Sequence, residues 1–244
     1  MPDEHVSFLH RCWPLALRLS PTLLRQSDVL FFSTGQFRYS LLEELWPTAS
    51  RLSGQTVRYE TFPNPGYQQG AMLAMEKAIE HKWFDGYDWV IRLNPDVLIR
   101  NETWLVKTML DDDVDGIFAE CPPFKYLWKK MHYKGLCEQK CTQARAQTDF
   151  FAIRPRILPR KIPVVIRHGE SNSEDGFTKA MSNVTKSGRD RWLPNQTQEG
   201  HCRITGRDSP VIHDHDFIKD DSCGNLGELV FKMSPINIAE HGIS

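Results

Sequence analysis

The N-terminal part of the chain alternates between two patterns of hydrophobic and polar positions. Residues 28–33 form a continuous apolar run, typical of a strand covered on both faces, and residues 56–62 alternate like a half-buried strand. Between 71 and 83 apolar side chains recur at helical spacing, and the Asp-Gly pair at 85–86 marks the end of this helix. Residues 87–93 return to a strand-like run. This alternation predicts an α/β fold with a mostly parallel central sheet flanked by helices.

The second half of the chain is less regular. Residues 148–153 predict another strand, and a short apolar run at 210–212 interrupts a region rich in Gly, Pro and charged residues. The three aspartates at 111–113 are interpreted as a solvated loop or helix end rather than a metal site. No internal repeat divides the chain, so residues 1–244 are expected to form a single domain.

The amino-acid composition limits the kinds of molecule that the chain is expected to bind. With 40% hydrophobic and 25% charged residues, the chain is expected to be globular rather than disordered. The 30 Lys and Arg residues nearly balance the 31 Asp and Glu residues, so no overall field attracts nucleic acid. A phosphate group must then be bound by local cations or a metal ion. No apolar run is long enough to span a membrane.

Cysteines and glycosylation sequons bear on the compartment. The six cysteines permit disulfide bonds, and the sequons at Asn101, Asn183 and Asn195 would accept glycans in a secreted protein. Both features favour an oxidising compartment without fixing it. The expectation is therefore open between a lumenal catalytic domain and a soluble cytoplasmic protein.

The most informative segment is the strand that runs directly into Asn94-Pro95-Asp96. In open α/β sheets, ligands bind beyond the carboxyl ends of the strands. A carboxylate held there after a rigid proline is suited to a hard divalent cation that bridges two phosphates. The alternative interpretation is an Asn-Pro-Asp turn without a ligand.

Asn94-Pro95-Asp96 resembles the Asp-x-Asp motif of GT-A glycosyltransferases, which also ends a strand. The resemblance implies that Asp96 and Asn94 bind Mn²⁺ or Mg²⁺ together with a nucleotide-diphosphate sugar, with UDP as the expected nucleotide. This chain departs from the motif at its first position. Asn94 would coordinate the metal through its amide oxygen, or hydrogen-bond the donor ribose, without adding charge. Residues 83–105 are most similar to glycosyltransferases of algae and large algal viruses.

The Glu174-Asp175 pair resembles the motif that supplies the catalytic base in many inverting GT-A enzymes. An inverting transfer needs one carboxylate to take the proton of the acceptor hydroxyl. A helix is predicted to begin near Ser171, and Ser171-x-x-Glu174 matches a capping box. The capping box would occupy Glu174 at the helix start, so Asp175 is the preferred base and Glu174 the alternative.

The C-terminal segment carries two histidines, His213 and His215, after the apolar run at 210–212. GT-A enzymes often take a further metal ligand from such a histidine, and imidazole is a suitable ligand. His213 is preferred because it directly follows the apolar run. The alternative is a pair of surface histidines in a polar loop.

Further residues are assigned to the donor by the same resemblance. Asp149 would bind sugar hydroxyls or cap a turn, and Arg92 would contact the diphosphate or form a structural ion pair. His10 and Arg11 follow a short strand predicted at residues 6–9, where the family binds the base and ribose. The resemblance extends over residues 5–216 as an ordered set of short motifs.

These assignments predict a Rossmann-like GT-A domain, with residues 1–97 binding the nucleotide sugar and residues 98–244 binding the acceptor. The expected reaction is metal-dependent transfer of a sugar to a hydroxyl of a glycan or glycoprotein, with inversion. One alternative is a metal-dependent hydrolase that uses His213 and His215. Another is a carbohydrate-binding domain without catalytic activity.

Overall fold

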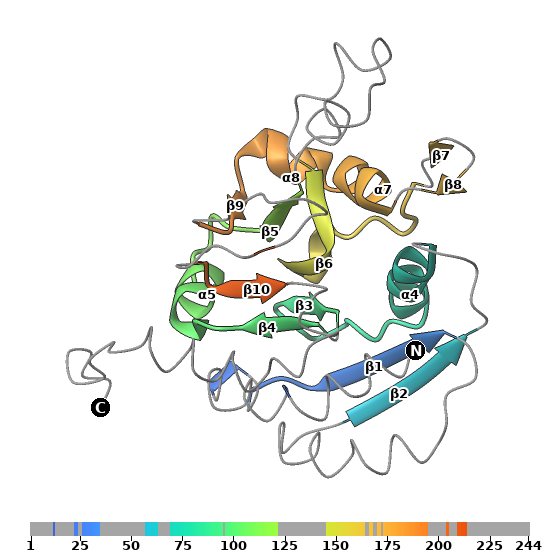
Figure 1. Ribbon diagram of the computed structural model, residues 1–244, viewed down its shortest axis with the longest axis horizontal. Coiled ribbons are helices and arrows are strands. Elements are labelled where there is room, and N and C mark those ends of the chain that lie inside the picture. The colour runs from blue at the N-terminus through green and yellow to red at the C-terminus, as the bar shows by residue number, and fades with distance from the viewer. Residues whose placement is uncertain are drawn as a thin grey trace, which may run out of the picture.

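The described part of the chain is a mixed α/β arrangement in which helices pack beside a four-stranded sheet (Figure 1). In the computed structural model of the protein, the residues described are 12, 22–23, 26–34, 57–62, 69–94, 96–121, 145–163, 166–167, 170–171, 173–194, 204 and 209–213. No helix in these ranges is both long and apolar enough to cross a membrane.

The four-stranded sheet has the order β3 (Val90–Leu93), β6 (Arg145–Ile153), β5 (Gly116–Cys121), β9 (Asp190–Trp192). Strand β6 runs antiparallel to both β3 and β5, and only β5 and β9 are parallel. The expectation of a mostly parallel central sheet is therefore wrong for this sheet. A continuous apolar run reports that a strand is covered on both faces, but it carries no information on the direction of its neighbours.

The first strands and the first long helix lie where the hydrophobic pattern predicts them. Strands β1 (Val29–Thr34) and β2 (Val57–Phe62) pair in parallel, and helix α4 (Gln69–Glu80) follows. A turn then leads to β3, and Gly86 adopts a φ of 87° in it, the left-handed conformation that glycine tolerates best. The predicted alternation of strand and helix is confirmed for this stretch.

Two short strands bring distant parts of the chain together. Strand β4 (Val97–Ile99) follows β3 almost at once and leads into helix α5 (Glu102–Met109). It pairs antiparallel with β10 (Val211–His213), so that His213 lies opposite Val97. The predicted C-terminal strand is thus confirmed, and it lies beside the segment that follows β3.

The core lies on both faces of β6, because its apolar side chains alternate between two clusters. Phe150 and Ala152 belong to the first cluster, and Phe151 and Ile153 to the second. Phe151 stacks on Phe177 of helix α7 (Ser173–Ala180), with ring centroids 4.3 Å apart. Alternation along a strand covered on both faces produces this division.

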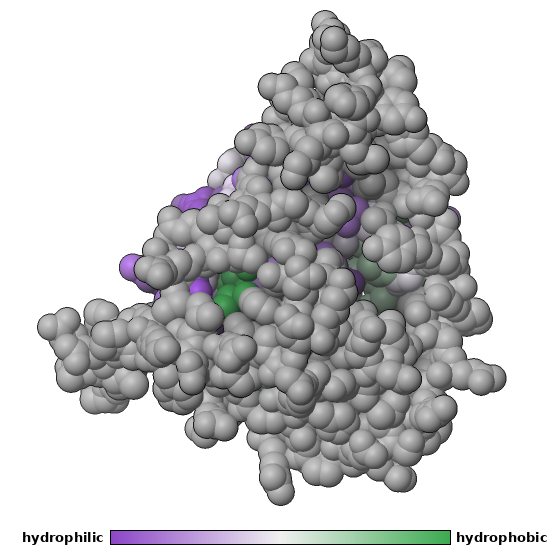
Figure 2. All heavy atoms as spheres, in the orientation of Figure 1, coloured by the Kyte–Doolittle hydropathy of each residue, from purple (hydrophilic) through white to green (hydrophobic). Residues whose placement is uncertain are grey.

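Several short elements make up the rest of the described fold. They are the 3-10 helix η1 (Pro155–Ile157), strands β7 (Ile166–Arg167) and β8 (Glu170–Ser171), and helix α8 (Ser182–Ser187). In the space-filling view of Figure 2 the described hydrophobic residues show only as small green areas. Among the described residues, the large hydrophobic side chains classed as exposed are Tyr87 and Leu110.

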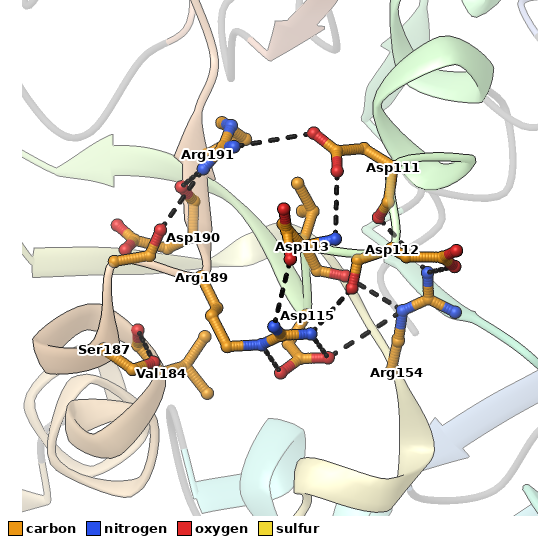
Figure 3. A network of polar contacts seen from close by, with 12 residues as sticks. Asp111, Asp112, Asp113, Asp115, Arg154, Val184, Ser187, Arg189, Asp190 and Arg191 are labelled. Atoms are coloured by element: carbon orange, nitrogen blue, oxygen red, sulfur yellow. Dashed lines mark hydrogen bonds and ion pairs between the residues drawn. The ribbon is translucent and has the colours of Figure 1, made fainter.

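Oppositely charged side chains form a network around Asp115 (Figure 3). It joins the segments at 111–115, 154–156 and 189–191. The Asp115 carboxylate accepts hydrogen bonds from Arg189 Nε and from Arg156 Nη2, each at 2.6 Å. The Arg154 side chain lies beside it and donates from Nε to the Val114 carbonyl at 2.9 Å. We call this the Asp115 network; its members are Asp111, Asp112, Asp113, Asp115, Arg154, Arg156, Arg189 and Arg191.

The aspartates at 111–113 lie in an exposed turn after α5 and pair with arginines of this network, as the interpretation of a solvated turn predicts. Cys12 is buried and disulfide-bonded, and no cysteine in the described ranges is free.

Candidate functional site

The segment between β3 and β4 is a tight turn that places Asp96 in the interior. The backbone N–H of Val97 donates to the Asn94 carbonyl at 3.0 Å, and the Asn94 N–H donates to the Asp149 carbonyl at 2.8 Å. These bonds fix the turn at both ends. The Asp96 side chain is fully buried, although a carboxylate is seldom buried without partners. The sequence thus correctly predicts that the strand ends at Asn94 and that a turn follows.

Strand β10 brings His213 to this turn. Its Nε2 atom lies 3.3 Å from Asp96 Oδ2, and its Nδ1 atom lies 3.9 Å from Asp149 Oδ2. The backbone of His213 also exchanges hydrogen bonds with Ile204, at 2.9 and 3.1 Å. The imidazole is fully buried and held from two sides, so it is part of the interior and not a surface histidine. The preferred histidine of the sequence analysis therefore lies beside the predicted carboxylate.

An irregularity in β6 brings Asp149 to the same place. Phe118 pairs with Phe151 and Glu120 pairs with Ala146, so β5 advances by two residues where β6 advances by five. The extra residues of β6, including Gln147, Thr148 and Asp149, form a bulge next to the end of β3. Bulges re-aim side chains and are frequent beside active sites.

Arg92 and Asn94 extend the polar contacts to β3. Arg92 Nη2 donates to Asn94 Oδ1 at 2.8 Å, and Asn94 Nδ2 donates to Asp149 Oδ1. Burial lowers the pKa of the Arg92 guanidinium. Three nearby carboxylates oppose this effect, in the order Asp149, Glu174, Asp96.

Helix α7 adds Glu174 to the group. Thr148 Oγ1 donates to Glu174 Oε1 at 3.4 Å, and Thr148 also lies 3.3 Å from the Ser173 hydroxyl. Burial raises the pKa of the Glu174 carboxyl, and the negative charge of Asp149 raises it further. Hydrogen bonds from its own backbone amide and from Ser173 act in the opposite direction. Gly176 allows helix α7 to lie close to the Pro163 backbone, because any side chain at this position would collide with the Pro163 carbonyl oxygen.

Asp175 points to a different partner. Its carboxylate lies 3.6 Å from Arg145 Nη1, and both side chains are about nine-tenths buried. The predicted capping box is wrong: Ser171 pairs with Ile166 between β8 and β7, and the helix begins only at Ser173. A Ser-x-x-Glu pattern alone does not reveal that the serine is engaged in a strand. The reason for preferring Asp175 over Glu174 as the base therefore falls away.

We call the assembled group the Asp96 cluster; its members are Arg92, Asn94, Asp96, Asp149, Glu174 and His213. Among the described residues, it holds three carboxylates and one guanidinium, and the Asp175–Arg145 pair lies beside it. Buried carboxylates are stabilised by a nearby cation or by a bound proton. The raised pKa of Glu174 reflects its burial first and the charge of Asp149 second, and the charge of Arg145 opposes both.

The His213–Asp96 pair fits two neighbouring ligands of one metal ion. An octahedral Mg²⁺ with ligands at about 2.1 Å has adjacent ligand atoms roughly 3 Å apart, and the Nε2–Oδ2 distance is 3.3 Å. Within the described ranges, no group of three His, Cys, Asp or Glu side chains is placed to hold a metal. Asp149 faces the opposite ring nitrogen, so it would orient His213 rather than bind the ion. Two protein ligands suffice where phosphates and water complete the coordination.

Three predicted site residues, His10, Arg11 and His215, are outside the part of the chain that the structure describes. Sequence reasoning missed Arg145, Thr148 and Gln147. Gln147 is fully buried, and its amide has no hydrogen-bond partner in the described part of the chain. The polar residues that precede the apolar run at 150–153 in β6 are the one signal that the sequence offers for them.

No protein-family model matches the chain, and the comparison with curated proteins finds no match.

Proposed function

We propose that the protein is a metal-dependent glycosyltransferase that moves a sugar from a nucleotide-diphosphate donor, such as a UDP-sugar, to a hydroxyl of a glycan or glycoprotein. The observation that carries the proposal is the buried Asp96–His213 pair at the end of β3, with the carboxylate of Asp149 on the opposite side of the His213 ring. A Mn²⁺ or Mg²⁺ ion bound there would neutralise charge on the departing diphosphate.

Each residue of the Asp96 cluster has a part in this function. Asp96 and His213 would hold the ion, and Asp149 would fix the orientation of the His213 ring from the opposite side. Arg92 supplies the positive charge that limits repulsion among the carboxylates. The proposal retains GT-A-like architecture for the whole chain, with the donor at the end of β3.

Glu174 is the preferred base in this proposal, in place of Asp175. Its raised pKa makes the carboxylate more basic, and a general base works best when its pKa approaches the operating pH. It lies near Asp149 and Arg92, whereas Asp175 is paired with Arg145. Thr148 orients the carboxylate through its hydroxyl. Inversion follows if the hydroxyl that Glu174 deprotonates attacks the anomeric carbon directly, on the face opposite the departing diphosphate.

The test is a thermal-shift screen of nucleotide sugars with and without Mn²⁺. A ligand that binds only the folded state raises the melting temperature by mass action. We expect stabilisation by one nucleotide sugar that depends on Mn²⁺ and is absent in Asp96→Asn. The control is Asp113→Asn, which removes the same charge at an exposed position of the Asp115 network.

Two other results would favour other functions. Stabilisation by glycans alone would indicate a carbohydrate-binding domain. Release of sugar or phosphate without an acceptor, unaffected by adding one, would indicate a hydrolase.

A further inference from the structure

We propose that Asn94 is a positioning residue: its amide joins the Arg92 guanidinium to the Asp149 carboxylate and thereby holds Asp149 against His213. This inference rests on the proposed function, since it concerns how the metal ligand His213 is oriented. It also departs from the sequence expectation that Asn94 itself binds the metal or the donor ribose. An aspartate at this position would then weaken the site instead of strengthening it.

The chemistry of the two neighbours determines how the Asn94 amide is oriented. A guanidinium has only donors and an ionised carboxylate only acceptors. Asn94 Oδ1 therefore accepts from Arg92 Nη2, at 2.8 Å, and Nδ2 donates to Asp149 Oδ1. An amide is an uncharged side chain that offers an acceptor to one neighbour and, from a separate atom, a donor to the other. The backbone N–H of Asn94 adds a second link, to the Asp149 carbonyl at 2.8 Å.

The two oxygens of Asp149 have different neighbours. Oδ1 is held by the Asn94 amide, and Oδ2 lies 3.9 Å from His213 Nδ1. Holding one oxygen fixes the plane of the carboxylate, and so the direction of the other oxygen. The opposite ring nitrogen of His213 then points to Asp96 Oδ2 at 3.3 Å. The contacts thus form a chain from β3 to β10, in the order Arg92, Asn94, Asp149, His213, Asp96, in which the Asp149–His213 contact at 3.9 Å is electrostatic and the others are hydrogen bonds.

An aspartate at position 94 would break this chain at one point. Its carboxylate could still accept from Arg92, but its second oxygen would face Asp149 Oδ1, where a donor is required. Two carboxylates at hydrogen-bond distance repel strongly in a buried site. Asp149 would have to turn away, and His213 would lose the contact that orients its ring. Partners beyond the ligands themselves typically account for 10–100-fold in metal affinity.

A reciprocal exchange distinguishes this role from direct metal binding. In the double variant Asn94→Asp/Asp149→Asn, the new carboxylate accepts from both Arg92 and the amide at 149. The amide oxygen at 149 still faces His213 Nδ1. Net charge and the donor–acceptor order of the chain are therefore restored. If Asn94 were a ligand of the ion, a carboxylate there would raise the affinity and the exchange at 149 would bring no recovery.

The experiment is an electron-paramagnetic-resonance titration of Mn²⁺ with the full chain, both single variants and the double variant. We expect Asn94→Asp to weaken Mn²⁺ binding roughly 10–100-fold and the double variant to recover most of that loss. Asn183→Asp, an exposed change of the same kind on α8, should leave the affinity unaltered. Binding of Mn²⁺ to Asn94→Asp as tight as to the unaltered protein, or tighter, overturns the inference.

Urea unfolding of the same four proteins without metal gives an independent readout. Positive coupling, in which the double variant is more stable than the two single changes predict, supports the link between positions 94 and 149. Absence of coupling overturns it even if the unaltered protein binds Mn²⁺. Coupling without any Mn²⁺ binding would instead refute the metal site of the proposed function. If Asn94→Asp does not fold, Asn94→Ala should bind Mn²⁺ roughly tenfold more weakly, and unchanged affinity again overturns the inference.

Discussion

The Asp115 network and the Asp96 cluster both bring carboxylates together with arginines, but they differ in how far the negative and positive charges balance. In the Asp115 network four aspartates meet four arginines, and most of these side chains are at least one-third exposed. Among the described residues, the Asp96 cluster holds three carboxylates and one arginine, and Asp96 is fully buried. Within the described part of the chain, the charges of the first group balance and those of the second do not.

The pKa directions express the same difference. Hydrogen bonds from Arg189, more than from Arg156, lower the pKa of Asp115, so the charged form of its carboxylate is favoured. Burial and the neighbouring Asp149 raise the pKa of Glu174, so its charged form is disfavoured. Groups whose pKa is shifted by burial and by a specific charged neighbour are frequent at functional sites. This contrast is why the proposed function is assigned to the Asp96 cluster.

The largest effect is expected from Asp96→Asn, which keeps the shape of the side chain and removes its charge. We expect Mn²⁺-dependent transfer to fall by roughly a thousandfold or more, since losing electrostatic stabilisation at the reacting group costs on this scale. The fold should persist, because asparagine has the same shape and its amide oxygen can still accept from the His213 ring. Activity and thermal melts on one preparation measure both, and retained activity with Mn²⁺ bound would contradict the metal assignment.

The next effect separates the two carboxylates of α7. Glu174→Gln should slow transfer by roughly a hundredfold or more while Mn²⁺ and donor affinity change little, as expected for loss of a general base. Asp175→Asn should instead cost about 1–3 kcal/mol of stability, because Arg145 stays buried without this carboxylate. Single-turnover rates and urea melts of both variants decide the roles. Slow transfer by Asp175→Asn together with full activity of Glu174→Gln would reverse the roles of the two carboxylates.

In the Asp115 network the main loss should be in stability. Asp115→Asn is expected to cost about 2–3 kcal/mol at pH 7, because it removes the acceptor of two short charged hydrogen bonds. Transfer activity per folded molecule should not change. Urea unfolding and rates at a temperature well below melting provide the measurement, and a large drop in rate would show that the two groups are coupled.

The two groups should also respond oppositely to pH. The lowered pKa of Asp115 stabilises the fold above its ordinary value of 3.8, and this contribution disappears as pH falls through the folded value. The raised pKa of Glu174 has the reverse sign: stability is lost as pH rises from its ordinary value of 4.5 through the folded value. Asp115→Asn should therefore be less stable than the unaltered protein at neutral pH and similar in strong acid. Glu174→Gln should be more stable at neutral pH, and urea melts across pH 2–7 compare them.

The smallest effect is expected at the rim of the Asp115 network. Asp112 is fully exposed and lies 3.7 Å from Arg154. Asp112→Asn should change stability by less than about 0.5 kcal/mol, since exposed ion pairs contribute little. A loss similar to that of Asp115→Asn, measured in the same urea series, would show that the network acts as one unit and not through its buried member.

Local pattern predicts much of the first part of the fold. The apolar run at 28–33, the helical spacing at 71–83 and the end of the strand before Asn94 all appear in the structure as expected. These features depend on burial and on neighbours in the chain, which the order of residues records directly. The direction of β6 and the bulge within it depend on strands far away in the sequence, so the pattern could not predict them.

For the candidate site, the sequence by itself determined the residue types and the strand end that presents Asp96. Only the tertiary structure decided which of them meet. His213 reaches Asp96 through the pairing of β10 with β4, and Asp149 reaches His213 through the bulge in β6. Glu174 joins the cluster and Asp175 does not, although the two are adjacent in the chain. Neighbouring helical positions point about 100° apart, and only the packing of α7 determines which of the two faces the cluster.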